Sequence, residues 1–139
     1  MDDRLTVTLI SRKSEIQRVN ELVEEFGERQ GLPPKVLFAV TLALEEILMN
    51  VISYGYPDAA DHEITVRVSV DQGEVRAEVE DDARPFNPLE APVPDTSKSL
   101  EERPIGGLGV HLTRKVMDAL DYHRRGNKNL LIMRKKVAV

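Results

Sequence analysis

Two polar side chains stand four residues apart in an otherwise apolar stretch of the sequence. Glu46 and Asn50 lie within residues 40–58, where alanine, valine, leucine and isoleucine dominate. If this stretch is a helix, residues four apart share a face, so the carboxylate and the amide are neighbours. A helix that is apolar nearly all round is normally covered on both sides. The pair therefore indicates the wall of a pocket, although plain solvation is the simpler interpretation for one isolated pair.

A third polar side chain, Asp81, ends a strand pattern. Residues 75, 77 and 79 are apolar and alternate with charged residues, and the same alternation puts Asp81 on the apolar side. A carboxylate on the core side is costly unless it has a partner or lines a cavity. Fraying of the strand, with Asp81 capping a turn, explains the pattern equally well.

A glycine-rich turn follows a long irregular segment. Residues 84–105 contain five prolines, and a loop of this length in a small domain is usually functional or disordered. The segment leads to Gly106, Gly107, Leu108 and Gly109, and Leu108, Leu112, Val116 and Leu120 then recur at helical spacing. Glycines at the start of a helix let backbone N–H groups approach an anion, but many such turns have no ligand.

The rest of the chain predicts the elements that position these residues. The expected elements are a strand at 5–9, a helix that begins with a capping box at Ser14 and Gln17 and ends before Gly31, a central helix opened by Pro33-Pro34, a hairpin at 64–80 around Asp71-Gln72-Gly73, and a second hairpin at 122–137 around residues 126–129. This order predicts an α+β two-layer sandwich, with a mostly antiparallel mixed sheet covered on one face by helices.

Composition limits the classes of protein to consider. The 139 residues suit one domain spanning 1–139, and 41% hydrophobic with 31% charged residues is typical of a globular protein. The net charge of −5 argues against nucleic acid as a partner. No apolar run approaches the roughly 20 residues of a membrane span and no signal peptide is recognised, so we expect a cytoplasmic protein without membrane contact. There is no cysteine, and the histidines at 62, 111 and 123 form no metal-ligand spacing.

The ordered set of motifs resembles the Bergerat ATP-binding fold of the GHKL superfamily, which includes gyrase, the heat-shock chaperone ATPase, histidine kinases and mismatch-repair ATPases. The resemblance is strongest to the stand-alone anti-sigma-factor serine/threonine-protein kinases, the switch-protein kinases, and it covers nearly the whole chain.

The resemblance implies a role for each motif. Asn50 would bind Mg²⁺, Glu46 would be the catalytic base, and Asp81 would accept a hydrogen bond from the adenine amine of ATP. The adenine motif would span residues 81–88, with Ala83 among the ATP-binding residues. Gly106, Gly107 and Gly109 would cradle the phosphates, Leu108 between them would also belong to the ATP site, and residues 84–105 would be the ATP lid.

Three positions depart from the pattern of this branch. Ala83 stands where glycine is usual, so its methyl group is expected to crowd the base. Tyr54 replaces a histidine common after the metal-binding asparagine. Ile132 is taken as the replacement for a late-strand threonine, with the loss of a polar contact near Asp81.

The leading hypothesis from the sequence is an anti-sigma regulatory factor with ATP- and Mg²⁺-dependent serine/threonine kinase activity. Its substrate would be a STAS-type anti-anti-sigma partner, and it would also sequester a sigma factor or an equivalent regulator. The resemblance also implies the ability to form a homodimer. The alternative is an ATP-binding anti-sigma or interaction module with little or no phosphotransfer. A third hypothesis, the detached catalytic half of a histidine kinase, is weaker because the chain has no room for a dimerising phosphoacceptor helix pair.

Overall fold

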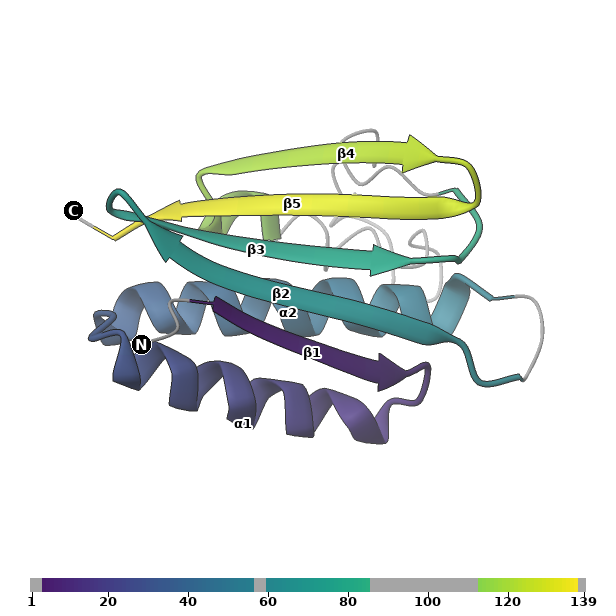
Figure 1. The fold of residues 1–139 in the computed structure, drawn as a ribbon, viewed down its shortest axis with the longest axis horizontal. Coiled ribbons are helices and arrows are strands. Elements are labelled where there is room, and N and C mark those ends of the chain that lie inside the picture. The colour runs from purple at the N-terminus through teal and green to yellow at the C-terminus, as the bar shows by residue number, and fades with distance from the viewer. Residues whose placement is uncertain (1–3, 57–59, 86–112, 138–139) are drawn as a thin grey trace, which may run out of the picture.

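A five-stranded antiparallel sheet forms one layer of the protein and two helices form the other (Figure 1). The computed structural model describes residues 4–56, 60–85 and 113–137. The elements are β1 (Arg4–Ile10), α1 (Ser14–Arg29), α2 (Pro34–Tyr54), β2 (Glu63–Asp71), β3 (Glu74–Asp81), β4 (Ala119–Arg125) and β5 (Lys128–Lys136). The strand order is β1-β2-β3-β5-β4, and both helices cover the same face of the sheet. The predicted two-layer α+β fold is confirmed, and every pairing between the described strands is antiparallel rather than mixed.

Two tight turns fix the register of the sheet. Gln72 and Gly73 join β2 to β3, and their φ angles of 50° and 75° are those of a two-residue turn that matches strand twist. Gly126, with φ of 58°, opens the turn between β4 and β5. Both hairpins were predicted. Their combined register sets Asn129 of β5 directly opposite Asp81, the last residue of β3.

The core lies between the sheet and the helices. Its largest fully buried side chains come from every layer: Leu9, Phe26, Leu44, Leu48, Ile64 and Met133. By length and composition α2 could span a membrane, contrary to the expectation that no apolar run approaches that length. Val40, Leu44 and Leu48 are buried in the core of the domain, however, and the buried residues of α2 recur at the spacing of one helix face, so its apolar composition is that of a helix that contributes one face to the core.

Two local predictions were wrong. Ser14 is the first residue of α1 and not its cap: no side-chain hydrogen bond caps this helix, and the Gln17 amide bonds Glu21 at 3.2 Å. Leu120 was assigned to the helix after the glycines, but it lies in β4, opposite Met133 of β5. Residues 113–116 are helical, and Leu108 and Leu112 lie outside the described residues.

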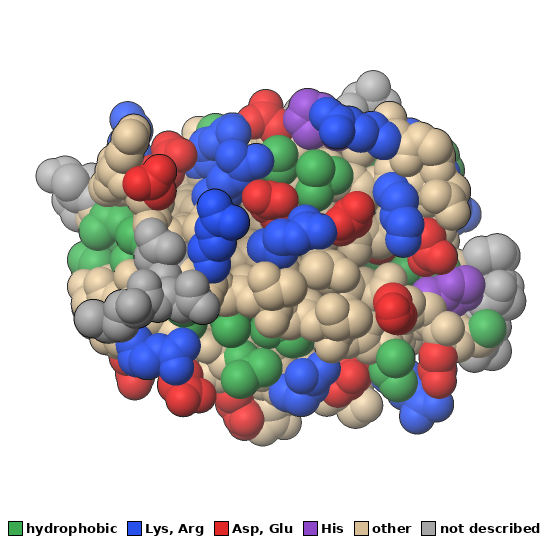
Figure 2. Space-filling model, viewed as in Figure 1, with side chains coloured by type: hydrophobic (Ala, Val, Ile, Leu, Met, Phe, Trp, Pro, Cys, Tyr) green, Lys and Arg blue, Asp and Glu red, His purple; other side chains and the backbone are tan. Residues whose placement is uncertain are grey.

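The open face of the sheet carries interleaved positive and negative side chains (Figure 2). The ion pairs on this face are Arg67 with Glu78 and Glu80 and Arg134 with Glu74 and Asp121, which join neighbouring strands, and Arg76 with Glu78 within β3. Each pair contributes little stability because it is partly exposed to water. Together, however, they neutralise much of the charge on this face.

Two phenylalanines on the two helices offer a matched test of the core. The Phe26 side chain is 0% exposed and Phe38 is 65% exposed. We expect Phe26→Ala to lower the free energy of unfolding by about 3–5 kcal/mol, because the deletion leaves a cavity. Phe38→Ala should change it by no more than about 0.5 kcal/mol. Urea denaturation measures both, and equal losses would contradict this assignment of the core.

Candidate functional site

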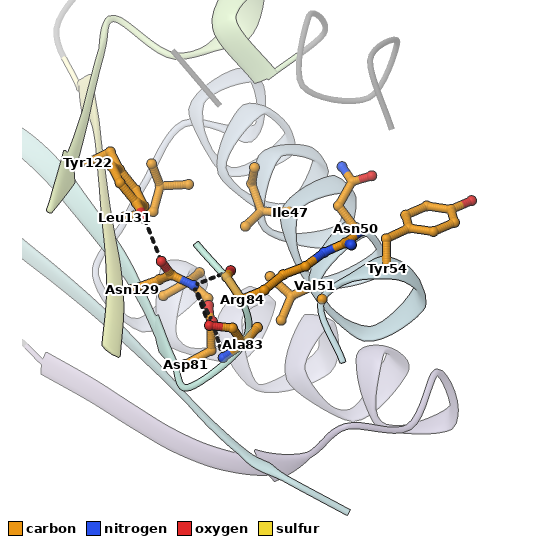
Figure 3. Close-up of a pocket in the computed structure, with 12 residues that line it drawn as sticks. Ile47, Asn50, Val51, Tyr54, Asp81, Ala83, Arg84, Tyr122, Asn129 and Leu131 are labelled. Atoms are coloured by element: carbon orange, nitrogen blue, oxygen red, sulfur yellow. Dashed lines mark hydrogen bonds between the residues drawn. The ribbon is translucent and has the colours of Figure 1, made fainter. Parts of the chain in front are cut away.

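A cavity of about 160 Å³ opens between the C-terminal half of α2 and the adjoining ends of β3 and β5 (Figure 3). Its lining is mostly apolar, with polar groups at a few points. The lining residues are Ile47, Asn50, Val51, Tyr54, Gly55, Val79, Asp81, Ala83, Arg84, Tyr122, Asn129 and Leu131. Apolar walls with a few fixed polar groups are the usual composition of a small-molecule site.

Asp81 supplies the buried carboxylate of this cavity. Its side chain is 4% exposed, so the alternation of β3 does continue to its last residue. Oδ1 accepts hydrogen bonds from the Ala83 backbone N–H at 3.0 Å and from Asn129 Nδ2 at 2.9 Å. Burial raises the pKa of the carboxyl group, and these two hydrogen bonds oppose that rise. Oδ2 accepts no bond from a described residue, which leaves one oxygen available to a ligand.

Asn129 is the site residue that the sequence analysis missed. Its Nδ2 donates to Asp81 Oδ1 and to the carbonyl oxygens of Ala83 (3.2 Å) and Arg84 (3.0 Å), as Figure 3 shows. Its Oδ1 accepts from Tyr122 Oη at 2.5 Å and from Arg124 Nη1 at 3.1 Å. These partners fix the orientation of the amide, because a flipped amide would set N–H against N–H. The pairing register of β3 with β5, which sets residue 129 opposite residue 81, was the signal that could have identified it.

The structure corrects the interpretation of Ile132. This residue pairs with Glu78 in the register of β3 and β5, three residues from the pairing of Asn129 with Asp81. An odd offset along a strand reverses the face, so Ile132 lies on the side of the sheet away from the cavity. The polar contact beside Asp81 is therefore present, and Asn129 provides it.

Asn50 and Glu46 lie on successive turns of α2, as the helical spacing predicted. Asn50 lines the cavity, and its Nδ2 donates to the backbone carbonyl of Glu46 at 2.9 Å. Its Oδ1 accepts no bond from a described residue and is available as a ligand oxygen. Glu46 is partly buried but does not line the cavity; burial, and secondarily the neighbouring Glu45, raise the pKa of its carboxyl group.

Gly55 and Ala83 meet where the end of α2 approaches the end of β3. A Cβ atom at position 55 would lie 2.5 Å from the Val51 carbonyl oxygen and 2.8 Å from the Ala83 Cβ, so no larger residue fits there. The Arg84 backbone N–H donates to the Gly55 carbonyl at 3.0 Å and holds the two segments together. The absence of a side chain at Gly55 thus makes room for the methyl group of Ala83, which was expected to crowd the base.

Most of the remaining predicted residues lie outside the described part of the chain. Gly106, Gly107, Leu108 and Gly109 lie outside the described residues, as does most of the segment 84–105. His62 stacks on Tyr56 with ring centroids 4.1 Å apart. In the described part of the chain no group of three histidine, aspartate or glutamate side chains could hold a metal ion by itself.

Comparison with protein families gives one match across most of the chain. The family described as the histidine kinase-like ATPase domain matches residues 9–135. The serine/threonine-protein kinase BtrW of Bordetella bronchiseptica is 28% identical over 111 residues, which cover 80% of this chain and 78% of BtrW. The chain is thus similar in sequence to a protein named as a serine/threonine kinase over about four fifths of each.

Comparison with solved structures supports the same fold. The structure of the RsbU and RsbW domains of Rv1364c from Mycobacterium tuberculosis superimposes with a TM-score of 0.72 at 15% identity, covering 98% of this chain and 33% of that one. The histidine kinase domain of the blue-light activated kinase from Erythrobacter litoralis gives 0.59 at 18% identity, covering 91% of this chain and 61% of that one. This chain therefore spans about a third of the first of these proteins.

Removal of the Asn129 amide tests the hydrogen-bond network. We expect Asn129→Ala to lower the free energy of unfolding by about 2–3 kcal/mol, because Asp81 Oδ1 and two backbone carbonyls each lose a buried donor. Asn127→Ala in the exposed turn of the same hairpin should cost no more than about 0.5 kcal/mol. Urea denaturation compares the two, and equal stabilities would show that the network is not a structural requirement.

Proposed function

The chain belongs to the histidine kinase-like ATPase domain family, and from this premise we propose that the cavity binds ATP with Mg²⁺ and that the protein phosphorylates a serine or threonine of a protein partner. The observation that carries the proposal is the free oxygen of Asp81 among apolar walls. An ionised carboxylate accepts hydrogen bonds but cannot donate them. It therefore suits the exocyclic amine of adenine and rejects the carbonyl that guanine has in the equivalent position.

The residues at the other part of the cavity fit a magnesium ion bound with phosphate. Asn50 offers an amide oxygen whose nitrogen is already engaged with the helix backbone. Mg²⁺ prefers oxygen ligands and usually takes only one or two from the protein, the others coming from phosphate and water. The absence of a cluster of acidic ligands among the described residues agrees with that mode. When bound, the ion neutralises phosphate charge and orients the phosphates for transfer.

Glu46 is our candidate for the general base. It lies one helical turn from Asn50, so a hydroxyl group placed near the nucleotide phosphates lies on the same side of α2. Partial burial of its carboxyl group raises the pKa, and a carboxylate of raised pKa is a stronger proton acceptor. In the proposed step the acceptor oxygen loses its proton to Glu46 as that oxygen forms its bond to the γ-phosphorus of ATP. The bond from this phosphorus to the β,γ-bridging oxygen breaks at the same time, and ADP leaves with the electron pair. Gly106, Gly107, Leu108 and Gly109 would hold the phosphates, with residues 84–105 as the lid.

The protein partner is proposed from the family resemblance. Similarity to a named serine/threonine-protein kinase and to a structure that contains an RsbW domain supports a STAS-type anti-anti-sigma protein as substrate. We further propose that the chain binds a sigma factor or equivalent regulator, acts in the cytoplasm, and is able to form a homodimer. Phosphorylation would weaken the complex with the substrate, because a phosphate group adds negative charge to an interface with an acidic chain.

Titration with Mg-ATP, followed by thermal shift and calorimetry, tests the nucleotide site. We expect the parent protein to be stabilised and Asp81→Asn to lose at least about 100-fold in ATP affinity, because an amide nitrogen replaces the free acceptor. Without ligand, Asp81→Asn should be as stable as the parent or more so at neutral pH, since the raised pKa shows that burial disfavours the charged form. A parent protein that binds no ATP would contradict the proposed function.

Phosphotransfer to a STAS protein tests the role of Glu46. Glu46→Gln should retain ATP binding yet lose at least about 100-fold in transfer rate, because it cannot accept the proton. In the parent, transfer should fall as the pH drops through a pKa above the ordinary glutamate value. Glu45→Gln is the matched control: transfer should persist, with its pH profile moved to lower pH because one neighbouring charge is gone. Undiminished transfer by Glu46→Gln excludes it as the base. If the parent binds ATP but transfers no phosphate, the chain is an ATP-binding module instead.

A further inference from the structure

Arg84 is a positive side chain on the cavity lining that has no acidic partner among the described residues. It lines the cavity and its side chain is exposed. No ion pair or side-chain hydrogen bond joins its guanidinium to another residue in the described ranges. By contrast, Arg12 pairs with Asp61 at 2.8 Å, and Arg67 and Arg134 pair with acids on the sheet. Arg84 thus differs from these arginines in that its charge lies beside the cavity with no described acid to neutralise it.

The backbone of Arg84 is held on both sides. Its N–H donates to the carbonyl of Gly55 at 3.0 Å, and its own carbonyl accepts from Asn129 at 3.0 Å. The first bond ties it to the end of α2 and the second to β5. The root of the side chain is therefore fixed at the rim of the cavity, although the charged end is free to adjust. A fixed root with a free guanidinium suits contact with a bound ligand.

The side chain extends from the Asp81 part of the cavity toward α2. In Figure 3 it runs from the turn after Asp81 in the direction of Asn50 and Tyr54. Under the proposed function these two parts of the cavity hold adenine and the magnesium–phosphate group, so the guanidinium spans the region between them. That region is where the sugar and the first phosphate of the nucleotide would lie.

We propose that Arg84 is a nucleotide-binding residue whose guanidinium donates hydrogen bonds to the phosphate oxygens nearest the ribose. This inference rests on the proposed function and adds a binding residue to that site. Guanidinium has donors only and carries a permanent charge, so it favours an anionic oxygen over the base or a neutral hydroxyl. The nearby Arg124 cannot take this role in the same way, because its Nη1 already bonds the Ala83 carbonyl and Asn129 Oδ1.

Binding of ADP, ATP and adenosine to charge variants at position 84 tests the proposal without a kinase assay. We expect Arg84→Ala and Arg84→Gln to weaken ADP and ATP about 10-fold and to leave adenosine unchanged, because only the phosphate contact is lost. Arg84→Lys should keep part of the affinity through its charge. Calorimetry measures the nucleotides, and displacement of a fluorescent ADP analogue measures adenosine.

The matched control is Arg4→Ala. Arg4 is exposed, lies in the register of β1 and β2 toward the opposite end of the sheet from Asp81, and its loss changes the net charge equally. It should leave all three affinities unchanged. Unchanged ADP affinity in Arg84→Ala, or an equal loss for adenosine, would overturn the proposal while leaving the ATP site in place. A parent protein that binds neither ADP nor ATP would instead overturn the proposed function together with it.

Discussion

Burial of the Asp81 carboxylate is the constraint on which the rest of the site depends. A buried charge is tolerated only when hydrogen bonds replace the water it has lost. The Ala83 N–H and the Asn129 amide do this for one oxygen, and Tyr122 and Arg124 in turn hold Asn129. Strands β3, β4 and β5 therefore meet in one polar network at the edge of an apolar cavity. Because no residue in the described ranges bonds the second oxygen, a ligand with an N–H donor would complete the network and should stabilise the fold.

The helical wall of the cavity is attached to this network by close backbone contact rather than by long side chains. The Gly55 carbonyl accepts from Arg84 N–H, and the absent side chain at 55 admits the methyl group of Ala83. The end of α2 is thus fixed against the end of β3, and Asn50 follows at a set position further back along the helix. The separation between the carboxylate and the amide is therefore a property of the fold, which is what recognition of two distant parts of one ligand requires.

The sequence allowed prediction of what depends on short periods and local turns. Alternation in β3 predicted the inward direction of Asp81, and glycines at 73 and 126 predicted both hairpins. Asn129 was missed because its place beside Asp81 follows from the register of β3 with β5, which residues distant in sequence determine. The sequence analysis assigned the polar contact beside Asp81 to position 132, but that position lies on the opposite face of the sheet from Asp81. Leu120 was misassigned because a short apolar run satisfies helical and strand spacing alike.

Local charge, rather than the net charge of −5, determines what the cavity attracts. On the open face of the sheet, acids and arginines pair and largely cancel. The two arginines beside the cavity, Arg84 and Arg124, differ in their contacts. Arg124 gives its hydrogen bonds to the chain, and its charge lowers the pKa of Asp81 against the effect of burial, which favours an ionised acceptor. The guanidinium of Arg84 bonds no described residue, so its donors are available to the proposed ligand. An acidic protein can then present, within one cavity, a negative group for an amine and a positive group for a phosphate.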